Sequence, residues 1–313
     1  MKAGSWLVLA LCAGCATSPS GDAARGDILV DGKNVHPESI SSSKDGSLYV
    51  GSINGIIYRA GPKDTTAEPF ITPDPGNGLR STYGVLADDK DGRLWVCSVA
   101  NGFARTPGPQ APSEVAAFEL KTGKLIGRWP FPAPGGTCND IAIAADGAAY
   151  ATDTPGGRIL KLPKGGKALE VVIASDQLKG VDGIAFAGDG RMYVNNVQKN
   201  QLWRVTPPHD GLAAELKLLT ADRTMGGPDG LRPIGGNRFL QAEGTAGRIT
   251  VVTIDGDNAH IEVLREGLQS SPNVALIGHT VYTVEGRINY LMDPQLRGKD
   301  PGPFKAIAIP LPQ

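Results

Sequence analysis

A hairpin pattern that returns six times is the feature that most constrains how this chain folds. Each copy has a polar residue, an alternating apolar strand, a tight turn and a second apolar strand. The first four turns contain an Asp-Gly pair, and the fifth contains Gly236-Asn237, residue types that suit the positive φ of a hairpin turn. The copies begin at Pro37, Tyr83, Cys138, Val181, Pro228 and Ser271.

The spacing of the copies predicts an all-β fold, a six-bladed β-propeller. We take as the anchor of each copy the residue seven before the turn Asp, or seven before Gly236 in the fifth copy. In the sixth copy the anchor is Asn273 counted from the first strand, which we prefer, or Ser271 counted from the second. Successive anchors lie 46, 55, 43, 47 and 44 residues apart. Further strand candidates follow each hairpin, so one repeat holds about four strands, as a propeller blade does. Four-stranded antiparallel blades are therefore expected around a central channel, in one domain over residues 30–313. Segments 62–80 and 106–113 are expected to be surface loops.

Composition excludes several other classes of protein. Lys and Arg number 31 against 32 Asp and Glu, so the net charge of −1 offers no electrostatic footprint for nucleic acid. The 42 Gly and 24 Pro argue against a helical bundle, and 41% hydrophobic residues are too many for general disorder.

The N-terminus has the pattern of an export signal. Lys2 precedes an apolar run, residues 6–13, that is far shorter than the roughly 20 residues of a membrane-spanning helix. The run ends in Ala-Gly-Cys15, which resembles a bacterial lipoprotein signal over residues 1–15 with Cys15 lipidated. An ordinary signal cut near Ala16 is the alternative. Residues 16–29 are polar and are interpreted as a flexible tether. We expect a protein of the cell envelope or periplasm, attached to the membrane only through Cys15, or alternatively a secreted one.

Two cysteines remain after the signal, Cys97 and Cys138. In an oxidising compartment they pair, or they stay buried and unpaired. The repeat frame places both at one mouth of the channel, between the second and third blades, so a bridge is geometrically allowed.

One repeat position carries the chemistry. Because the innermost strand of each blade lines the channel, residues at one repeat position form a ring at one mouth. Five of the six are oxygen donors and three are carboxylates, which repel one another unless a cation lies between them. Hard oxygens without Cys or His favour Ca²⁺, or another divalent cation, over Zn²⁺. The alternative is that polar residues cap strands and never meet. The ring is Glu38, Gly84, Asn139, Asp182, Asp229 and Asn273.

A second set of polar residues lies seven positions after each turn. We interpret these side chains either as a layer that supports the ring or as polar strand ends in solvent. The set is Ser52, Ser98, Asp153, Asn196 and Glu243. Asn273 and Asp140, the neighbour of Asn139, are further candidates for the ring or its support.

The ring and the hairpins resemble the calcium-dependent six-bladed propellers of the senescence marker protein, gluconolactonase and luciferin-regenerating enzyme family (regucalcin-like), over about residues 30–300. Glu38 matches the family's first-blade Glu, Asn139 its Asn-Asp pair and Asp229 its Pro-Asp-Gly string. Asp182 stands where the family usually has Asn. The resemblance implies that these four residues bind a catalytic Ca²⁺. With Asp182 the set carries −3 against +2, so either one carboxyl group holds a proton or one serves as a base.

The resemblance implies hydrolysis of a small-molecule lactone or ester. Asp229 or Asp182 would be the general base or the nucleophile, and Glu38 and Asn139 chiefly metal ligands. The alternative is a non-catalytic propeller of the cell envelope that binds a ligand or a partner protein. A strictosidine-synthase-like propeller is a third hypothesis, although the strictosidine synthase reaction does not need an acidic ring.

Overall fold

The computed structural model describes Met1 and residues 25–100 and 111–312. The predicted lipoprotein signal beyond Met1, including Cys15, and residues 16–24 of the predicted tether lie outside the described residues. None of the described helices has the length and apolar character needed to cross a membrane.

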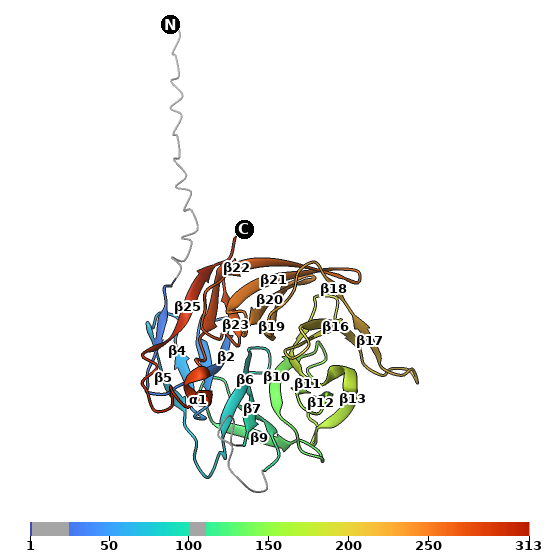
Figure 1. Ribbon diagram of the computed structural model, residues 1–313, viewed down its shortest axis with the longest axis horizontal. Coiled ribbons are helices and arrows are strands. Elements are labelled where there is room, and N and C mark those ends of the chain that lie inside the picture. Colours follow the sequence, from blue (N-terminus) through green and yellow to red (C-terminus); the bar gives the residue numbers. More distant parts are fainter. Residues whose placement is uncertain (2–24, 101–110, 313) are drawn as a thin grey trace.

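The predicted hairpins form the two inner strands of six blades arranged around one axis (Figure 1). The innermost strands are β2 (Pro37–Ser42), β6 (Ser81–Asp88), β10 (Cys138–Ile143), β14 (Val181–Phe186), β19 (Pro228–Gly235) and β23 (Val274–Ile277). The second strands are β3 (Leu48–Ser52), β7 (Arg93–Val99), β11 (Ala149–Asp153), β15 (Met192–Asn196), β20 (Arg238–Glu243) and β24 (Thr280–Val284). The Gly of each Asp-Gly turn has positive φ, from 64° to 87°. In the fifth turn the positive-φ pair is Gly235-Gly236, not Gly236-Asn237.

Two outer strands complete each blade. The third strands are β4 (Ile57–Ala60), β8 (Glu114–Glu119), β12 (Arg158–Leu162), β16 (Gln201–Thr206), β21 (Arg248–Asp255) and β25 (Phe304–Pro310). The fourth strands are β5 (Thr66–Ile71), β9 (Leu125–Pro130), β13 (Glu170–Ala174), β17 (Glu215–Leu218), β22 (Asn258–Arg265) and β1 (Ile28–Val30). A short β18 (Thr220–Ala221) pairs in parallel with β22. The prediction of a loop over residues 62–80 was wrong in part, because β5 lies within it.

The N-terminal strand closes the ring of blades. β1 pairs antiparallel with β25 of the sixth blade and parallel with β5 of the first. The hydroxyl of Tyr282 also donates to the carbonyl of Arg25 at 2.7 Å. The predicted tether over 16–29 was therefore wrong at its C-terminal end, because residues 28 and 29 are part of the sheet. The sixth copy supplies only three strands, and β1 provides the missing outer one.

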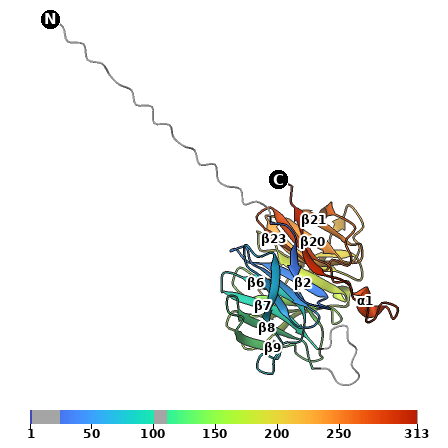
Figure 2. The ribbon, with the colours of Figure 1, turned by 90° about the vertical axis from the view of Figure 1, so that its left-hand side faces the viewer.

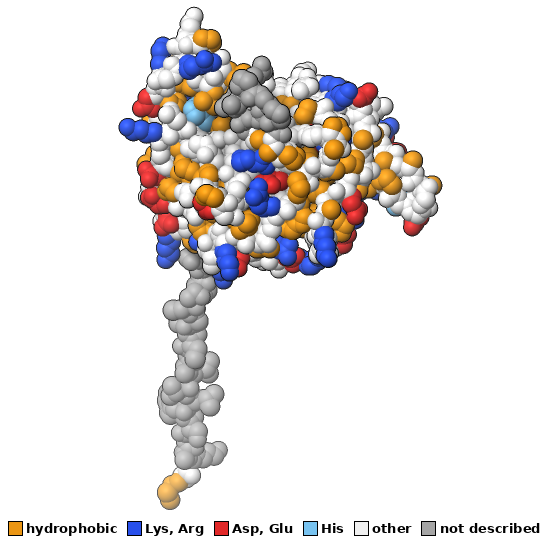
Figure 3. Space-filling model, turned by 90° about the horizontal axis from the view of Figure 1, so that it is seen from below, with side chains coloured by type: hydrophobic (Ala, Val, Ile, Leu, Met, Phe, Trp, Pro, Cys, Tyr) orange, Lys and Arg blue, Asp and Glu red, His pale blue; other side chains and the backbone are white. Residues whose placement is uncertain are grey.

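The hydrophobic core is divided among the blades. Six clusters of buried residues each lie between two neighbouring blades. A buried aromatic residue recurs on each second strand and packs in these clusters. These residues are Tyr49, Trp95, Tyr150, Tyr193, Phe239 and Tyr282. Towards solvent, the side of the propeller in Figure 3 mixes basic and acidic side chains with hydrophobic ones.

A disulfide joins the second and third blades. Cys97 on β7 and Cys138 at the start of β10 are bonded, with their Cα atoms 5.2 Å apart. The sequence left open whether these cysteines pair or stay buried and unpaired, and in the structure they are paired. Both cysteines are fully buried.

Removing this bridge should lower the stability of the domain. The bridge spans 41 residues, and closing a loop of that length in the unfolded chain stabilises the fold by about 4 kcal/mol in the chain-entropy treatment. We expect the double variant Cys97→Ala/Cys138→Ala to lose about this free energy of unfolding in urea titrations. Wild-type protein measured with and without a thiol reductant is the control. Equal midpoints for oxidised and reduced wild type would contradict the prediction.

Candidate functional site

A β-bulge lies at the ring position in five of the blades. The pairing of the inner and second strands skips residue 38 in the first blade and two residues in each of the next four. A bulge turns a side chain away from the regular alternation of a strand, so these residues lie at the mouth where the inner strands begin. We call this end of the channel the anchor mouth. The opposite end, where the hairpin turns lie, is the turn mouth.

The bulges correct one member of the predicted ring. In the second blade the skipped pair is Tyr83-Gly84, and in the fourth and fifth blades the pairs are Asp182-Gly183 and Asp229-Gly230. Tyr83 therefore corresponds to Asp182 and Asp229, and Gly84 corresponds to the glycines. A Cβ added to Gly183 would lie 2.2 Å from the carbonyl oxygen of Asp229. In the second, fourth and fifth blades the second bulge position thus needs glycine because the neighbouring blade approaches it closely, whereas the third blade has Asp140 there.

The structure brings three predicted carboxyl groups together at the anchor mouth. Asp182 is buried, with 3% of its surface exposed, and the side-chain amide of Asn139 donates to its Oδ2 at 2.8 Å. The carboxyl of Asp229 donates a hydrogen bond to Asp182. Glu38 lies close enough for its charge to interact with both aspartates. The phenol of Tyr83 borders the same group.

Burial and mutual repulsion hold these acids in their protonated forms. Burial, then the charge of Asp182, raises the pKa of Glu38 to about 8. Burial, then the charge of Asp140, raises the pKa of Asp182 to about 7, against the hydrogen bonds from Asp229 and Asn139 and the charge of Arg232. Burial and the charges of Asp182 and Glu38 raise the pKa of Asp229 well above its usual range. Asp182 and Asp229 therefore behave as a pair that shares a proton.

These raised pKa values predict how metal-free protein responds to pH. Glu38 and Asp182 keep their protons to about pH 8 and 7 when folded, but their ordinary values are 4.5 and 3.8. Between these limits the folded state binds more protons than the unfolded state, so stability falls as pH rises. We expect the melting temperature in chelator to decline from about pH 5 to about pH 8. Glu38→Gln should flatten this decline in circular-dichroism melts, and an unchanged slope would contradict the prediction.

The oxygen atoms of the ring are of the kind that a hard cation prefers, although they do not surround a metal position completely. Oε2 of Glu38 and Oδ1 of Asp182 are buried and accept no hydrogen bond from any described residue. Buried oxygens of this kind are the ligands that Ca²⁺ prefers. Across residues 25–100 and 111–312, however, no three His, Cys, Asp or Glu side chains are grouped so that they could hold a metal ion. In the metal-free protein, the proton shared by Asp182 and Asp229 reduces the negative charge that a bound cation would otherwise balance.

Solved structures similar to this chain are propellers. A proposed gluconolactonase has 18% identity and a TM-score of 0.65, covering 94% of this chain and 96% of its own. The calcium-binding protein regucalcin from Agrobacterium tumefaciens has 17% identity and a TM-score of 0.61, covering 92% and 96%. Virginiamycin B lyase from Staphylococcus aureus has 13% identity and a TM-score of 0.59, covering 91% and 98%. The chain is a six-bladed β-propeller. At these identities the likeness establishes the fold.

The sequence comparisons are narrower. Residues 24–60 match the family described as strictosidine synthase-like, N-terminal. This segment includes β1 to β4 and Glu38. The match relates to the third hypothesis of the sequence analysis, a strictosidine-synthase-like propeller. No curated protein matches the chain.

The prediction that Asp153, Asn196 and Glu243 support the ring was wrong. Asp153 and Glu243 instead stabilise turns of their own blades. Each is fully buried and paired with the arginine five residues later, Arg158 or Arg248. Asp153 also accepts from the backbone N–H of Thr137 at 2.9 Å. Asn196 has the same kind of role, since it caps the turn that follows it and donates to the carbonyl of Lys179. They are not strand ends in solvent, and none of their hydrogen bonds to described residues reaches the ring.

Asn273 and Asp140 have structural partners as well. Asn273 donates to the hydroxyl of Ser39 at 3.2 Å and accepts from the N–H of Val274 at 2.8 Å, so its side chain links the sixth blade to the first. Asp140 is directed away from the ring into a bidentate pair with Arg232, at 2.7 and 2.8 Å. Its charge still reaches the ring, since it raises the pKa of Asp182.

The residues that support the bulges were missed. Thr152 accepts from the N–H of Asp140 and donates to the carbonyl of Asp182 at 2.7 Å, which ties the third blade to the fourth. Asn195 accepts from the N–H of Gly183 and donates to the carbonyl of Asp229 at 2.6 Å. Both lie one position before the set that was chosen. A polar residue at the next-to-last position of the second strand was the available signal.

Proposed function

We propose that this propeller is an exported, calcium-dependent hydrolase that acts on a small lactone or ester at the anchor mouth. The observation that carries the proposal is the group of three carboxyl groups, buried Asp182 beside partly exposed Glu38 and Asp229, with two oxygens that lack hydrogen-bond partners among the described residues. Similarity to a proposed gluconolactonase and to a calcium-binding regucalcin supports it. The disulfide supports an oxidising compartment.

The residues have distinct roles in this proposal. Glu38, Asp182, Asp229 and the amide oxygen of Asn139 would hold Ca²⁺, because the amide nitrogen of Asn139 is already directed at Asp182 and Thr154. Bound Ca²⁺ would supply polarisation of a carbonyl and stabilisation of the developing oxyanion. In its ionised form, Asp229 would take the proton from the attacking water, because a carboxylate with a raised pKa is a stronger base than an ordinary one. Asp182 accepts a hydrogen bond from Asp229 and so orients it.

A screen of lactones and aryl esters with the purified protein tests the proposal. We expect turnover that a chelator abolishes and that added Ca²⁺ restores. Turnover that persists in chelator would contradict the metal-dependent mechanism. Calcium binding without turnover of any substrate would instead favour the non-catalytic propeller, whose ring binds a ligand or partner.

A further inference from the structure

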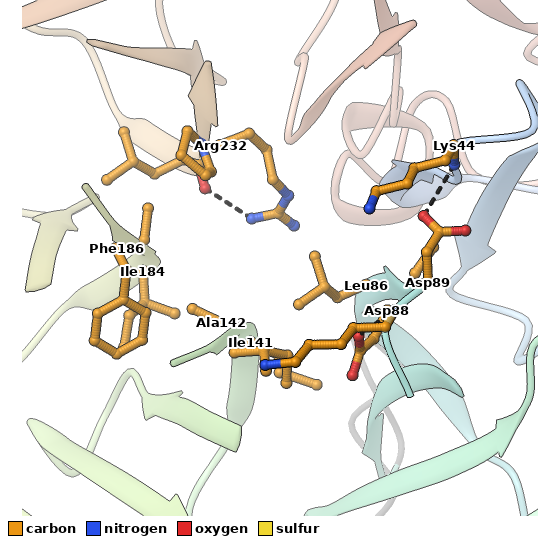
Figure 4. A pocket seen from close by; sticks show the side chains of 15 residues that line it. Lys44, Leu86, Asp88, Asp89, Ile141, Ala142, Ile184, Phe186 and Arg232 are labelled. Carbon is orange, nitrogen blue, oxygen red and sulfur yellow. Dashed lines mark hydrogen bonds between the residues drawn. The ribbon is translucent and has the colours of Figure 1, made fainter. Parts of the chain in front are cut away.

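A second cavity lies at the turn mouth, at the other end of the channel from the ring (Figure 4). Its volume is about 300 Å³, within the range of small-molecule sites. Its lining comes from the C-terminal halves of the inner strands and from the first two hairpin turns. Phe186 in the cavity lies four residues beyond Asp182 along β14, or about 13 Å. The cavity is therefore a separate site, and the argument below does not depend on the proposed function.

The walls of the cavity are apolar and one side of it holds a cation. Leu86, Ile141, Ile184 and Phe186 surround the space, and the guanidinium of Arg232 extends into it (Figure 4). Arg232 is 8% exposed. Such a setting strengthens a hydrogen bond to a charged group, because little water competes for it.

Two of the five N–H donors of Arg232 have no acceptor among the described residues: Nε–H and the second N–H of Nη2. Asp140 accepts from both of its terminal nitrogens, and the carbonyl of Leu231 accepts from one of them at 2.9 Å. The third nitrogen, Nε, is buried and has no hydrogen-bond partner among the described residues. A buried N–H without an acceptor is costly. A ligand carboxylate beside the guanidinium would accept from the second N–H of Nη2, and from Nε after a small shift of the side chain.

Lys44 provides a second donor with a net positive charge. Its ammonium group is directed towards the cavity (Figure 4), and within the described part of the chain it has no ion pair or hydrogen bond. The other charged groups of the rim are occupied. Asp89 accepts from the N–H of Lys44 at 2.9 Å, and Asp88 accepts from the N–H of Lys90 and from the indole of Trp95. The ammonium of Lys90 donates to the carbonyl of Ala145 at 3.1 Å.

We propose that the turn-mouth cavity binds a small amphipathic monocarboxylate, with its carboxylate between Arg232 and Lys44 and its apolar body against Leu86, Ile141 and Phe186. Arg232 is balanced by Asp140 and the ammonium of Lys90 donates to a carbonyl, so Lys44 is the lining cation whose side chain has no partner among the described residues. A phosphate ester would bring up to two negative charges close to Asp88 and Asp89. A cavity of 300 Å³ suits an acid with a short aliphatic chain or one aromatic ring.

Calorimetric titration with octanoate tests this site, with octyl phosphate and neutral octanamide as comparison ligands. We expect saturable binding of one octanoate per chain and none of octanamide. Lys44→Glu should weaken octanoate binding at least tenfold. Lys167→Glu, the same charge reversal at an exposed lysine outside the cavity, should leave it unchanged. Arg232→Lys keeps a cation beside Asp140 but removes Nε, and it should also weaken binding.

Three results would overturn the proposal. They are no saturable binding of octanoate, equal binding by wild type and Lys44→Glu, or binding of octyl phosphate in preference to octanoate. Lys44 is exposed in a turn, so its variants are expected to fold even if Arg232→Lys does not. Octanoate binding should be the same with Ca²⁺ or chelator, which separates this site from the ring.

Discussion

Asp229→Asn is expected to abolish calcium-dependent hydrolysis while leaving the propeller folded. The substitution keeps the size of the side chain but removes the group that would ligate the metal and take the proton from water. Loss of a general base alone lowers kcat by about 100-fold to 10,000-fold. The measurement is kcat/KM with the substrate that the screen identifies. Because burial and two neighbouring acids disfavour ionisation of Asp229, the metal-free variant should melt no lower than wild type.

The matched control for Asp229→Asn is Glu262→Gln. Glu262 is an exposed carboxylate on β22, far along the chain from the ring, and has no ion pair with a described residue. It should retain wild-type activity. A variant Asp229→Asn with activity close to that of wild type would show that Asp229 is neither base nor essential ligand.

Breaking the buried pair between Asp140 and Arg232 is expected to cause a large loss of stability. Arg232→Met leaves the carboxylate of Asp140, which is 2% exposed, without its counter-charge. Removing one partner of a buried ion pair costs about 3–5 kcal/mol. The measurement is the free energy of unfolding from urea titration.

A double variant separates this pair from simple loss of packing. The double variant Asp140→Asn/Arg232→Met has no charge at either position of this pair. The amide oxygen of the new asparagine can still accept from the N–H of Ile184. This variant should recover most of the lost stability. Arg191→Met removes an exposed ion pair with Asp189 and should cost about 1 kcal/mol or less. If the double variant is as unstable as Arg232→Met, packing and not charge explains the loss.

The blades could be predicted from sequence because each is a local unit. Turn glycines and alternating apolar residues recur within about 45 residues, and each of the six hairpins expected from this pattern forms the two inner strands of a blade. The closing strand β1 could not be found in this way, because it is short and pairs with strands more than 30 residues and more than 270 residues away.

The site was predicted in part. The pattern found Glu38, Asp182 and Asp229, because one side chain per blade recurs at the same position. Counting from the turn selected Gly84 over Tyr83, since a bulge changes the register without a consistent sequence signal. Asp140 and Arg232 are 92 residues apart, so only the closed ring of blades brings them together. The pairs of Asp153 and Glu243 with arginines five residues later were visible in the sequence and were overlooked.

Calorimetric titration of the purified, chelator-treated protein with Ca²⁺ at about pH 8, where the ring acids ionise most readily, tests the central claim most directly. We predict one calcium site per chain, lost in Asp229→Ala and retained in Glu262→Gln. Release of protons on binding should accompany it, because Glu38, with a pKa of about 8, and Asp229, with a pKa well above its usual range, hold protons in the metal-free ring. No binding by wild type, or equal binding by wild type and Asp229→Ala, would contradict the assignment of the ring as a calcium site.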